Sequence, residues 1–168
     1  MKEKFKTLFF VRSSLISLYL ALTIPVPFIS SEKLKIISII TFIFGLFLII
    51  KITNDYVNTC DRKISYKTSF ISKILGKKNW EIFWKDIKSI KSLPTSQGGM
   101  VHYFITNNNE SYLIPQRVEN FDRFLSVVKD KTKFNVKEIS YISPLWTYKL
   151  LTYISIFMIL GEILAFIV

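Results

Sequence analysis

The stretch that decides the fold runs from Lys78 to Pro115 and reads KNWEIFWKDIKSIKSLPTSQGGMVHYFITNNNESYLIP. Apolar and polar residues alternate in short runs within it, and a period of two is typical of a half-buried β-strand. The segments Pro94–Gly99 and Asn107–Asn109 separate these runs, and both are rich in residues that favour turns. The stretch therefore predicts short antiparallel strands joined by tight loops.

The alternation also predicts which side chains face the core of this sheet. In Met100–Thr106, the face towards the core is expected to carry Val101, Tyr103 and Ile105. The opposite face is expected to carry His102 and Phe104. The run Lys78–Trp84 places one set of apolar side chains on a common side: Trp80, Ile82 and Trp84. Upstream, the segment KISYKTSF predicts a further strand over Lys63–Phe70, with one face formed by Ile64, Tyr66, Thr68 and Phe70.

A helix is predicted after the strands. Apolar residues recur there at i, i+3, i+4 and i+7, which forms one stripe on a helix: Phe121, Phe124, Leu125 and Val128. Asn120 suits the N-cap position, and lysines follow in the last turn. The middle of the chain thus predicts an antiparallel β-sheet or barrel closed by a C-terminal amphipathic helix.

Very apolar segments flank this region on both sides. Half of the 168 residues are hydrophobic, which is typical of small membrane proteins. Transmembrane helices are predicted at about residues 13–29, 36–50 and 150–168, with Pro25 and Pro27 kinking or ending the first. A signal peptide is the alternative for the first segment. The predicted organisation is an α+β membrane protein: a hairpin domain over 1–52, a polar domain over 53–140 and a third span within 141–168.

The charge pattern predicts an orientation. The net charge is +11, and residues 51–149 hold 17 Lys and Arg against 9 Asp and Glu. The bias of Lys2, Lys4, Lys6, Arg12 and Lys51 places the N-terminus and the polar domain in the cytoplasm, and the C-terminus outside. A bacterial inner membrane or a thylakoid is the expected location. A basic domain beside membrane spans favours anionic lipid headgroups over nucleic acid as a partner.

The polar domain resembles the bacterial pleckstrin-homology-like (PH-like) domains of small membrane proteins. The resemblance covers about residues 53–133, and three segments carry it: KISYKTSF, the step Trp84-Lys85-Asp86-Ile87 and the helix VENFDRFLSVV. It implies five to seven strands with one C-terminal helix, and a role in scaffolding and self-association rather than catalysis. The arrangement of two spans before such a domain also resembles that of a photosystem I assembly factor of chloroplasts and photosynthetic bacteria. The predicted third span is a difference from that arrangement.

Three places are candidates for binding a lipid or a partner. The first is a set of lysines on turns and strand edges, which would form a headgroup-binding face or simply a solvated one: Lys73, Lys77, Lys78, Lys85, Lys88 and Lys91. The second is the loop Gln97-Gly98-Gly99 with His102, where backbone amides could approach an anion, or where glycine serves only a hairpin turn. The third is Glu162 within the last span, which would pair with Lys33 or Lys35 or reach outer-surface water.

Catalytic and cofactor chemistry have little support in the sequence. The chain has one cysteine, Cys60, and one histidine, too few for a disulfide or a zinc cluster, and no motif of nucleophile, paired acids or phosphate loop occurs. We therefore expect no enzyme, no metal and no cofactor. The expected function is a membrane scaffold or assembly accessory with a protein partner or a second copy. An anionic-lipid sensor and a small subunit of a transport complex are the alternatives.

Overall fold

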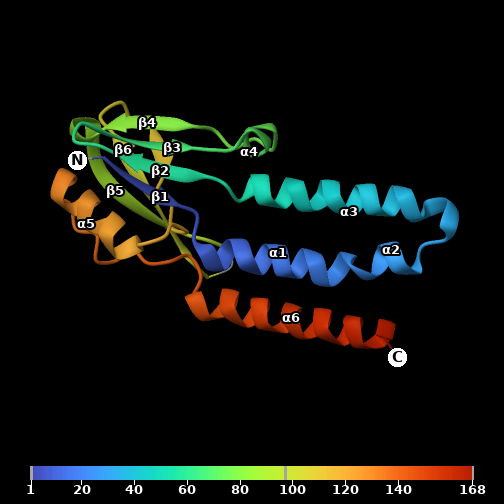
Figure 1. Cartoon of the computed structure of the whole chain (residues 1–168). Coiled ribbons are helices and arrows are strands. Elements are labelled where there is room, and N and C mark those ends of the chain that lie inside the picture. The colour runs from blue at the N-terminus through green and yellow to red at the C-terminus, as the bar shows by residue number, and fades with distance from the viewer. Residues whose placement is uncertain (1, 97, 168) are drawn as a thin grey trace. The chain divides into compact units, whose positions relative to one another are not determined.

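A computed structural model describes residues 2–96 and 98–167 (Figure 1). The chain divides into two compact units, Met1–Leu8 with Asn54–Ser143, and Phe9–Thr53 with Pro144–Val168. We call the first the sheet unit and the second the helical unit, and describe each by itself. The α+β class and the antiparallel strands are confirmed.

The sheet unit contains two antiparallel sheets. The first has the strand order β1-β2-β3-β4, with bounds Glu3–Lys6, Tyr56–Thr59, Lys63–Lys67 and Trp80–Phe83. The second has the order β5-β6-β7, with bounds Ile87–Pro94, Met100–Thr106 and Ser111–Leu113. The 3₁₀ turn η1, Trp84–Asp86, connects the sheets. No ladder between described strands joins them, so the sheets do not close into a barrel.

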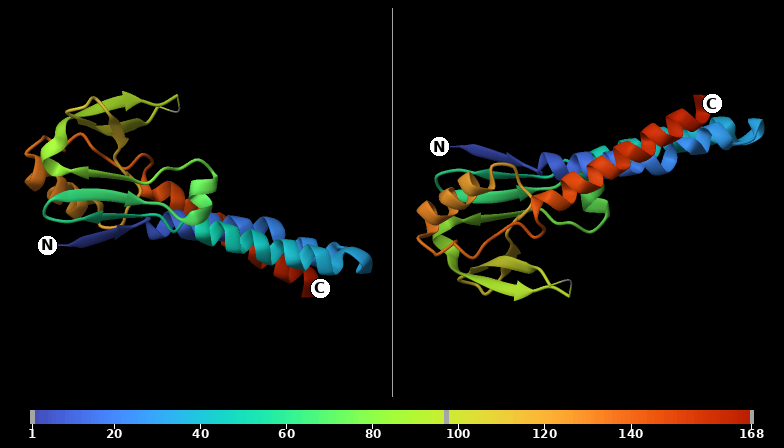
Figure 2. Two further views of the ribbon diagram at one scale, coloured as in Figure 1. Left: turned by 90° about the horizontal axis from the view of Figure 1, so that it is seen from above. Right: turned by 90° about the horizontal axis from the view of Figure 1, so that it is seen from below.

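The core of the sheet unit lies between the two sheets and the helix α5, Phe121–Thr132. Figure 2 shows α5 across one end of the space between the sheets. The helix buries Phe121, Phe124, Val127 and Val128, so the predicted stripe is largely confirmed. Asn120 occupies the predicted N-cap position in the left-handed conformation at φ 50°, but its side chain makes no cap bond.

The strand β1 was not predicted, because four of the first six residues are charged. It pairs with β2, with Phe5 opposite Val57. Phe5 is buried, and its ring meets that of Phe124 edge-on at a centroid distance of 5.4 Å. The Arg123 guanidinium also donates hydrogen bonds to both carboxylate oxygens of Glu3, at 3.1 and 2.6 Å. The N-terminus is therefore an edge strand of the first sheet.

One predicted strand face and one predicted strand end are wrong. In β6 the buried residues are His102, Phe104 and Thr106, whereas the residues predicted to face the core are only half-buried. Both faces of this strand carry apolar residues, so alternation alone could not choose between them. The strand predicted over Lys63–Phe70 ends at Lys67, and Phe70 starts a short helix, α4, Phe70–Ile74.

Among the described residues of the helical unit, three helices are long and apolar enough to cross a membrane: Phe9–Ile29, Glu32–Ile52 and Leu145–Phe166. The first consists of α1, Phe9–Thr23, and α2, Pro25–Ile29, which meet just before Pro25 as the prolines predicted. The second is α3, Glu32–Ile52, and the third is α6, Leu145–Ile167. All three begin before the predicted 13–29, 36–50 and 150–168, since aromatic and charged residues at their ends also take helical geometry.

Two different contacts hold the helical unit together. The helix α1 packs along α6, and its buried side chains are mostly small, namely Ser14, Ser17 and Ala21. Small residues let two helices approach closely. Towards α3, the Tyr19 hydroxyl donates a hydrogen bond of 2.8 Å to the carbonyl of Phe42. A Cβ at Gly45 would lie 2.3 Å from that hydroxyl oxygen, so glycine provides the space for it.

Candidate functional site

The loop between β3 and β4 contains the most unusual surface of the sheet unit. It begins with α4, whose N-cap Ser69 accepts a hydrogen bond from the amide N–H of Ser72 at 3.1 Å. The Ser69 hydroxyl also donates to the Ser72 hydroxyl, which is fully buried. These hydrogen bonds stabilise the first turn of the short helix, as expected for a serine N-cap.

The loop is closed at its base by a second set of hydrogen bonds. The Asn79 side-chain carbonyl accepts hydrogen bonds from the amide N–H and the hydroxyl of Thr68, at 2.7 and 2.9 Å. Gly76 ends the helix with a φ of 87°, a conformation that favours glycine, and the Lys77 amide N–H then donates to the carbonyl of Ser72. We call the segment Thr68–Asn79 the α4 loop.

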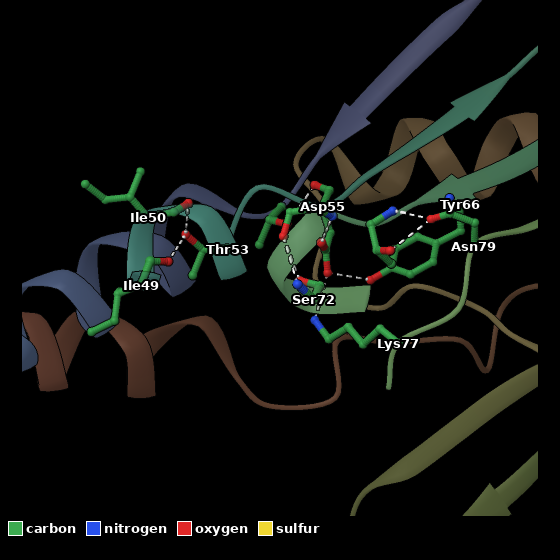
Figure 3. A network of polar contacts seen from close by, with 11 residues as sticks. Ile49, Ile50, Thr53, Asp55, Tyr66, Ser72, Lys77 and Asn79 are labelled. Atoms are coloured by element: carbon green, nitrogen blue, oxygen red, sulfur yellow. Dashed lines mark hydrogen bonds and ion pairs between the residues drawn. The ribbon is translucent and has the colours of Figure 1, made fainter. Parts of the chain in front are cut away.

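Asp55 joins this loop to the start of β2. Its carboxylate accepts hydrogen bonds from the Ser69 amide N–H at 2.9 Å and from the Tyr66 hydroxyl at 3.0 Å (Figure 3). The ammonium of Lys77 contacts the same carboxylate at 2.7 Å. Burial raises the pKa of Asp55, but the contacts with Lys77, Ser69 and Tyr66 outweigh it and hold the pKa below its ordinary value.

The α4 loop holds three large apolar side chains out in solvent. Phe70 is 77% exposed, Ile74 69% and Leu75 64%. Lys73, Lys77 and Lys78 lie among them and are exposed, and the segment from Phe70 to Lys78 contains no acidic residue. A surface that combines exposed aromatic and aliphatic side chains with lysines suits the boundary between lipid headgroups and acyl chains. The sequence predicts these lysines as candidates, whereas the alternation in Lys63–Phe70 wrongly places Phe70 in a strand.

The remaining candidate lysines lie elsewhere. Lys73, Lys77 and Lys78 are near Trp80 at the beginning of β4, whereas Lys85 lies in η1 after the other end of that strand. Lys88 and Lys91 follow on β5 in the second sheet. All six are exposed. The lysines that cluster in the sequence are therefore divided between two regions of the sheet unit.

The loop that contains Gly98 and Gly99 is held by hydrogen bonds within the loop. Gly98 has a φ of 78°, and its amide N–H donates to the carbonyl of Thr95. The Gly99 amide N–H donates to the Thr95 hydroxyl at 3.0 Å. Both amides already have acceptors, which favours the hairpin interpretation over an anion site. Gln97 lies outside the described residues.

His102 belongs to the interior rather than to a surface. It is 1% exposed, and its Nδ1 lies 2.8 Å from the hydroxyl of Ser92 on the neighbouring strand. Burial lowers the pKa of the imidazole, against the opposing effect of Glu138, so the ring is neutral at pH 7. Its Nε2 has no hydrogen-bond partner among the residues that the structure describes. A surface ligand therefore has no access to this side chain.

A hollow of about 300 Å³ lies beside β4 and the β6–β7 turn and carries three carboxylates, those of Glu81, Asp86 and Glu110. Two of them are already engaged, Glu81 by the ammonium of Lys63 and Glu110 by the hydroxyl of Tyr112. In the described ranges, no group of three His, Cys, Asp or Glu residues is placed to hold a metal ion. Two of the three carboxylates in the hollow are thus already used in pairing.

Glu162 lies in α6 within the helical unit. One of its carboxylate oxygens is buried without a hydrogen-bond partner among the described residues. Lys35, one of its two predicted partners, instead contacts Glu32 at 3.4 Å on α3. No contact between Glu162 and Lys33 occurs in the described part of the chain.

The chain is similar to a protein of a cyanobacterium. No family model matches the chain. The chain is 28% identical over 147 residues to the uncharacterized protein slr0269 of Synechocystis sp., an alignment that covers 84% of this chain and 74% of that protein. Because 147 residues exceed the length of the sheet unit, the similarity includes parts of both units.

Proposed function

We propose that this protein is a non-enzymatic membrane scaffold or assembly accessory that presents a PH-like domain at the membrane surface. The observation that carries the proposal is the strand arrangement. In the described part of the sheet unit, seven strands in two antiparallel sheets are followed by the helix α5, with the short helix α4 between β3 and β4 and the turn η1 between β4 and β5. A number of strands between five and seven with one helix after them is what the resemblance to PH-like domains implies, so this order supports the proposal. The two proposed spans are inserted between the first and second strands.

The insertion supports a definite topology. Because β1 and β2 are hydrogen-bonded neighbours, the residues before α1 and after α3 lie on the same side of the membrane. The helices α1 to α3 then cross and return, and α6 crosses once more to leave the C-terminus on the opposite side. The basic residues Lys2, Lys4 and Lys6 belong to the same side as the sheet unit, which we assign to the cytoplasm.

The outer face of the second sheet is the surface that we assign to a protein partner. Cross-strand pairs place Leu93 opposite Val101, and Tyr103 opposite both Lys91 and Leu113, so these side chains share one face. This face is opposite to the buried His102 and Phe104, and Leu93 and Leu113 are exposed. An apolar face of this kind on a sheet is suited to burial against another protein.

The test is crosslinking and affinity isolation of the intact protein from native membranes. We expect a stable protein complex with the wild type and its loss in the double variant Leu93→Ser and Leu113→Ser. The variant Phe83→Ser is the matched control, because Phe83 is 46% exposed on the first sheet. Isolation of the chain without any partner, or equal recovery of the partner with both variants, contradicts the proposed role of this face.

A further inference from the structure

We infer that the α4 loop is a lipid-binding element that inserts Phe70, Ile74 and Leu75 into the anionic surface of the membrane the chain spans. This inference rests on the membrane anchoring proposed above and adds a second contact with the bilayer. The observation behind it is that the three largest exposed apolar side chains of this loop project from a base that is held rigidly.

The first argument is the place of the loop in its sheet. Lys6 at the end of β1, Tyr56 at the start of β2 and Lys67 at the end of β3 lie side by side in register. Neighbouring strands are about 4.8 Å apart, so Lys67 is within about 10 Å of Lys6. Both chain connections to α1 and α3 leave the sheet at this end, and the α4 loop begins at the very next residue, Thr68.

The second argument is the rigidity of the loop. Flexible apolar side chains would fold back onto the domain, but here Asp55, Ser69, Ser72 and Asn79 fix the backbone on both sides of the tip. Ser72 is the residue of the helix that turns inward and is fully buried. Phe70 and Ile74, which lie two residues to either side of it, are exposed, and their surface is therefore available for lipid.

The third argument is the charge of the loop. Among the residues that the structure describes, Lys73 and Lys78 form no ion pair, whereas Lys77 is held by Asp55. Two unpaired ammonium groups beside an apolar tip match an anionic headgroup layer, where each lysine near the surface favours binding. A lipid surface also accepts side chains in any rotamer, so it needs no complementary pocket.

The experiment uses the full-length protein reconstituted in vesicles. A Cys60→Ser background removes the single cysteine, and an environment-sensitive fluorophore is attached at Leu75→Cys. Vesicles of phosphatidylcholine alone are compared with vesicles containing phosphatidylglycerol, and spin-labelled lipid serves as the quencher. We expect a blue-shifted emission and lipid quenching at residue 75, stronger in the anionic vesicles. The matched control is Phe83→Cys at the other end of the first sheet, where Phe83 pairs with Lys63, and this position should stay unquenched.

The lysines are tested in the same assay. The double variant Lys73→Gln and Lys78→Gln should lower the insertion equilibrium about fivefold per lysine in anionic vesicles and leave neutral vesicles unchanged. Equal quenching of the wild type in both vesicle types contradicts the anionic preference. A blue shift at residue 75 without lipid quenching shows that protein covers the loop, and it overturns the inference.

A label at Ile43→Cys in α3 separates the two proposals. Ile43 is exposed on the most apolar helix of the chain and should be quenched strongly if the helices cross the bilayer. Quenching at residue 43 but not at residue 75 contradicts only the role of the α4 loop. Failure of quenching at residue 43 contradicts the membrane anchoring and, with it, the inference that depends on it.

Discussion

The Asp55 carboxylate accepts a hydrogen bond from the amide N–H of Ser69, 14 residues further along the chain, at 2.9 Å. This contact connects the residue just before β2 with the N-cap of α4. Asp55 also receives Lys77 from the other end of the α4 loop, so one carboxylate holds both sides of the exposed apolar tip. Asp55 therefore adds to the hydrogen bonds of Ser69, Ser72 and Asn79 that position this tip.

Asp55→Ala should release the α4 loop. The substitution leaves the Ser69 amide and the Tyr66 hydroxyl without their acceptor, and an unsatisfied buried polar group costs about 1–3 kcal/mol. Hydrogen–deuterium exchange should show faster exchange at Ser69 and Ser72, with little change in α5. Glu110→Ala is the matched control, because that exposed carboxylate bonds only Tyr112 among described side chains, and it should leave the loop protected.

Acid should have the same effect as the substitution. The pKa of Asp55 is lowered in the folded state, so its ionised form contributes stability that is complete above the ordinary aspartate pKa of about 3.9. That contribution is lost as the pH falls through the lower, folded-state pKa. Exchange at Ser69 should accelerate below about pH 4 in the wild type and change less in Asp55→Asn. Identical pH profiles would show that Asp55 is not the responsible group.

Phe5→Ala tests whether the N-terminal strand belongs to the core. Phe5 is buried against Phe124, and truncation of a buried phenylalanine costs about 3–5 kcal/mol. Limited proteolysis should cut the sheet unit at lower protease concentration in this variant than in the wild type. Phe83→Ala, at a half-exposed position, is the matched control. Equal resistance of the two variants would place β1 outside the cooperative unit.

Gly45→Ala tests the contact between α1 and α3. A Cβ at Gly45 would overlap with the Tyr19 hydroxyl, so the tyrosine must move and its hydrogen bond to Phe42 should weaken. Gly161→Ala in α6 is the control, because a Cβ there has no neighbour within 4 Å. We expect a lower thermal stability in detergent for Gly45→Ala alone. Restoration by Tyr19→Phe in the Gly45→Ala background would identify the hydroxyl as the cause.

The sequence alone determined the elements whose hydrophobic pattern fits only one type of secondary structure. Three long apolar segments predicted helices of membrane-spanning length, and the i, i+3, i+4 and i+7 spacing from Phe121 predicted α5. The turn residues in Pro94–Gly99 and Asn107–Asn109 predicted the loops that bound β6. In these places, local spacing and backbone preference are sufficient, because a single periodicity is present and no distant contact is needed.

Tertiary structure decided the features that depend on residues far apart in the chain. The charged segment Glu3–Lys6 becomes a strand only because β2 offers a partner edge some fifty residues later, and Phe5 then fills the space beside Phe124. In β6, apolar residues occupy both faces, so the position of α5 and the other sheet selects Phe104 for the core. The exposed tip of the α4 loop is likewise fixed by Asp55, whose contacts no local pattern contains. Burial and hydrogen bonding between distant segments arise only in the folded chain, so the periodicity of apolar residues in the sequence does not predict them.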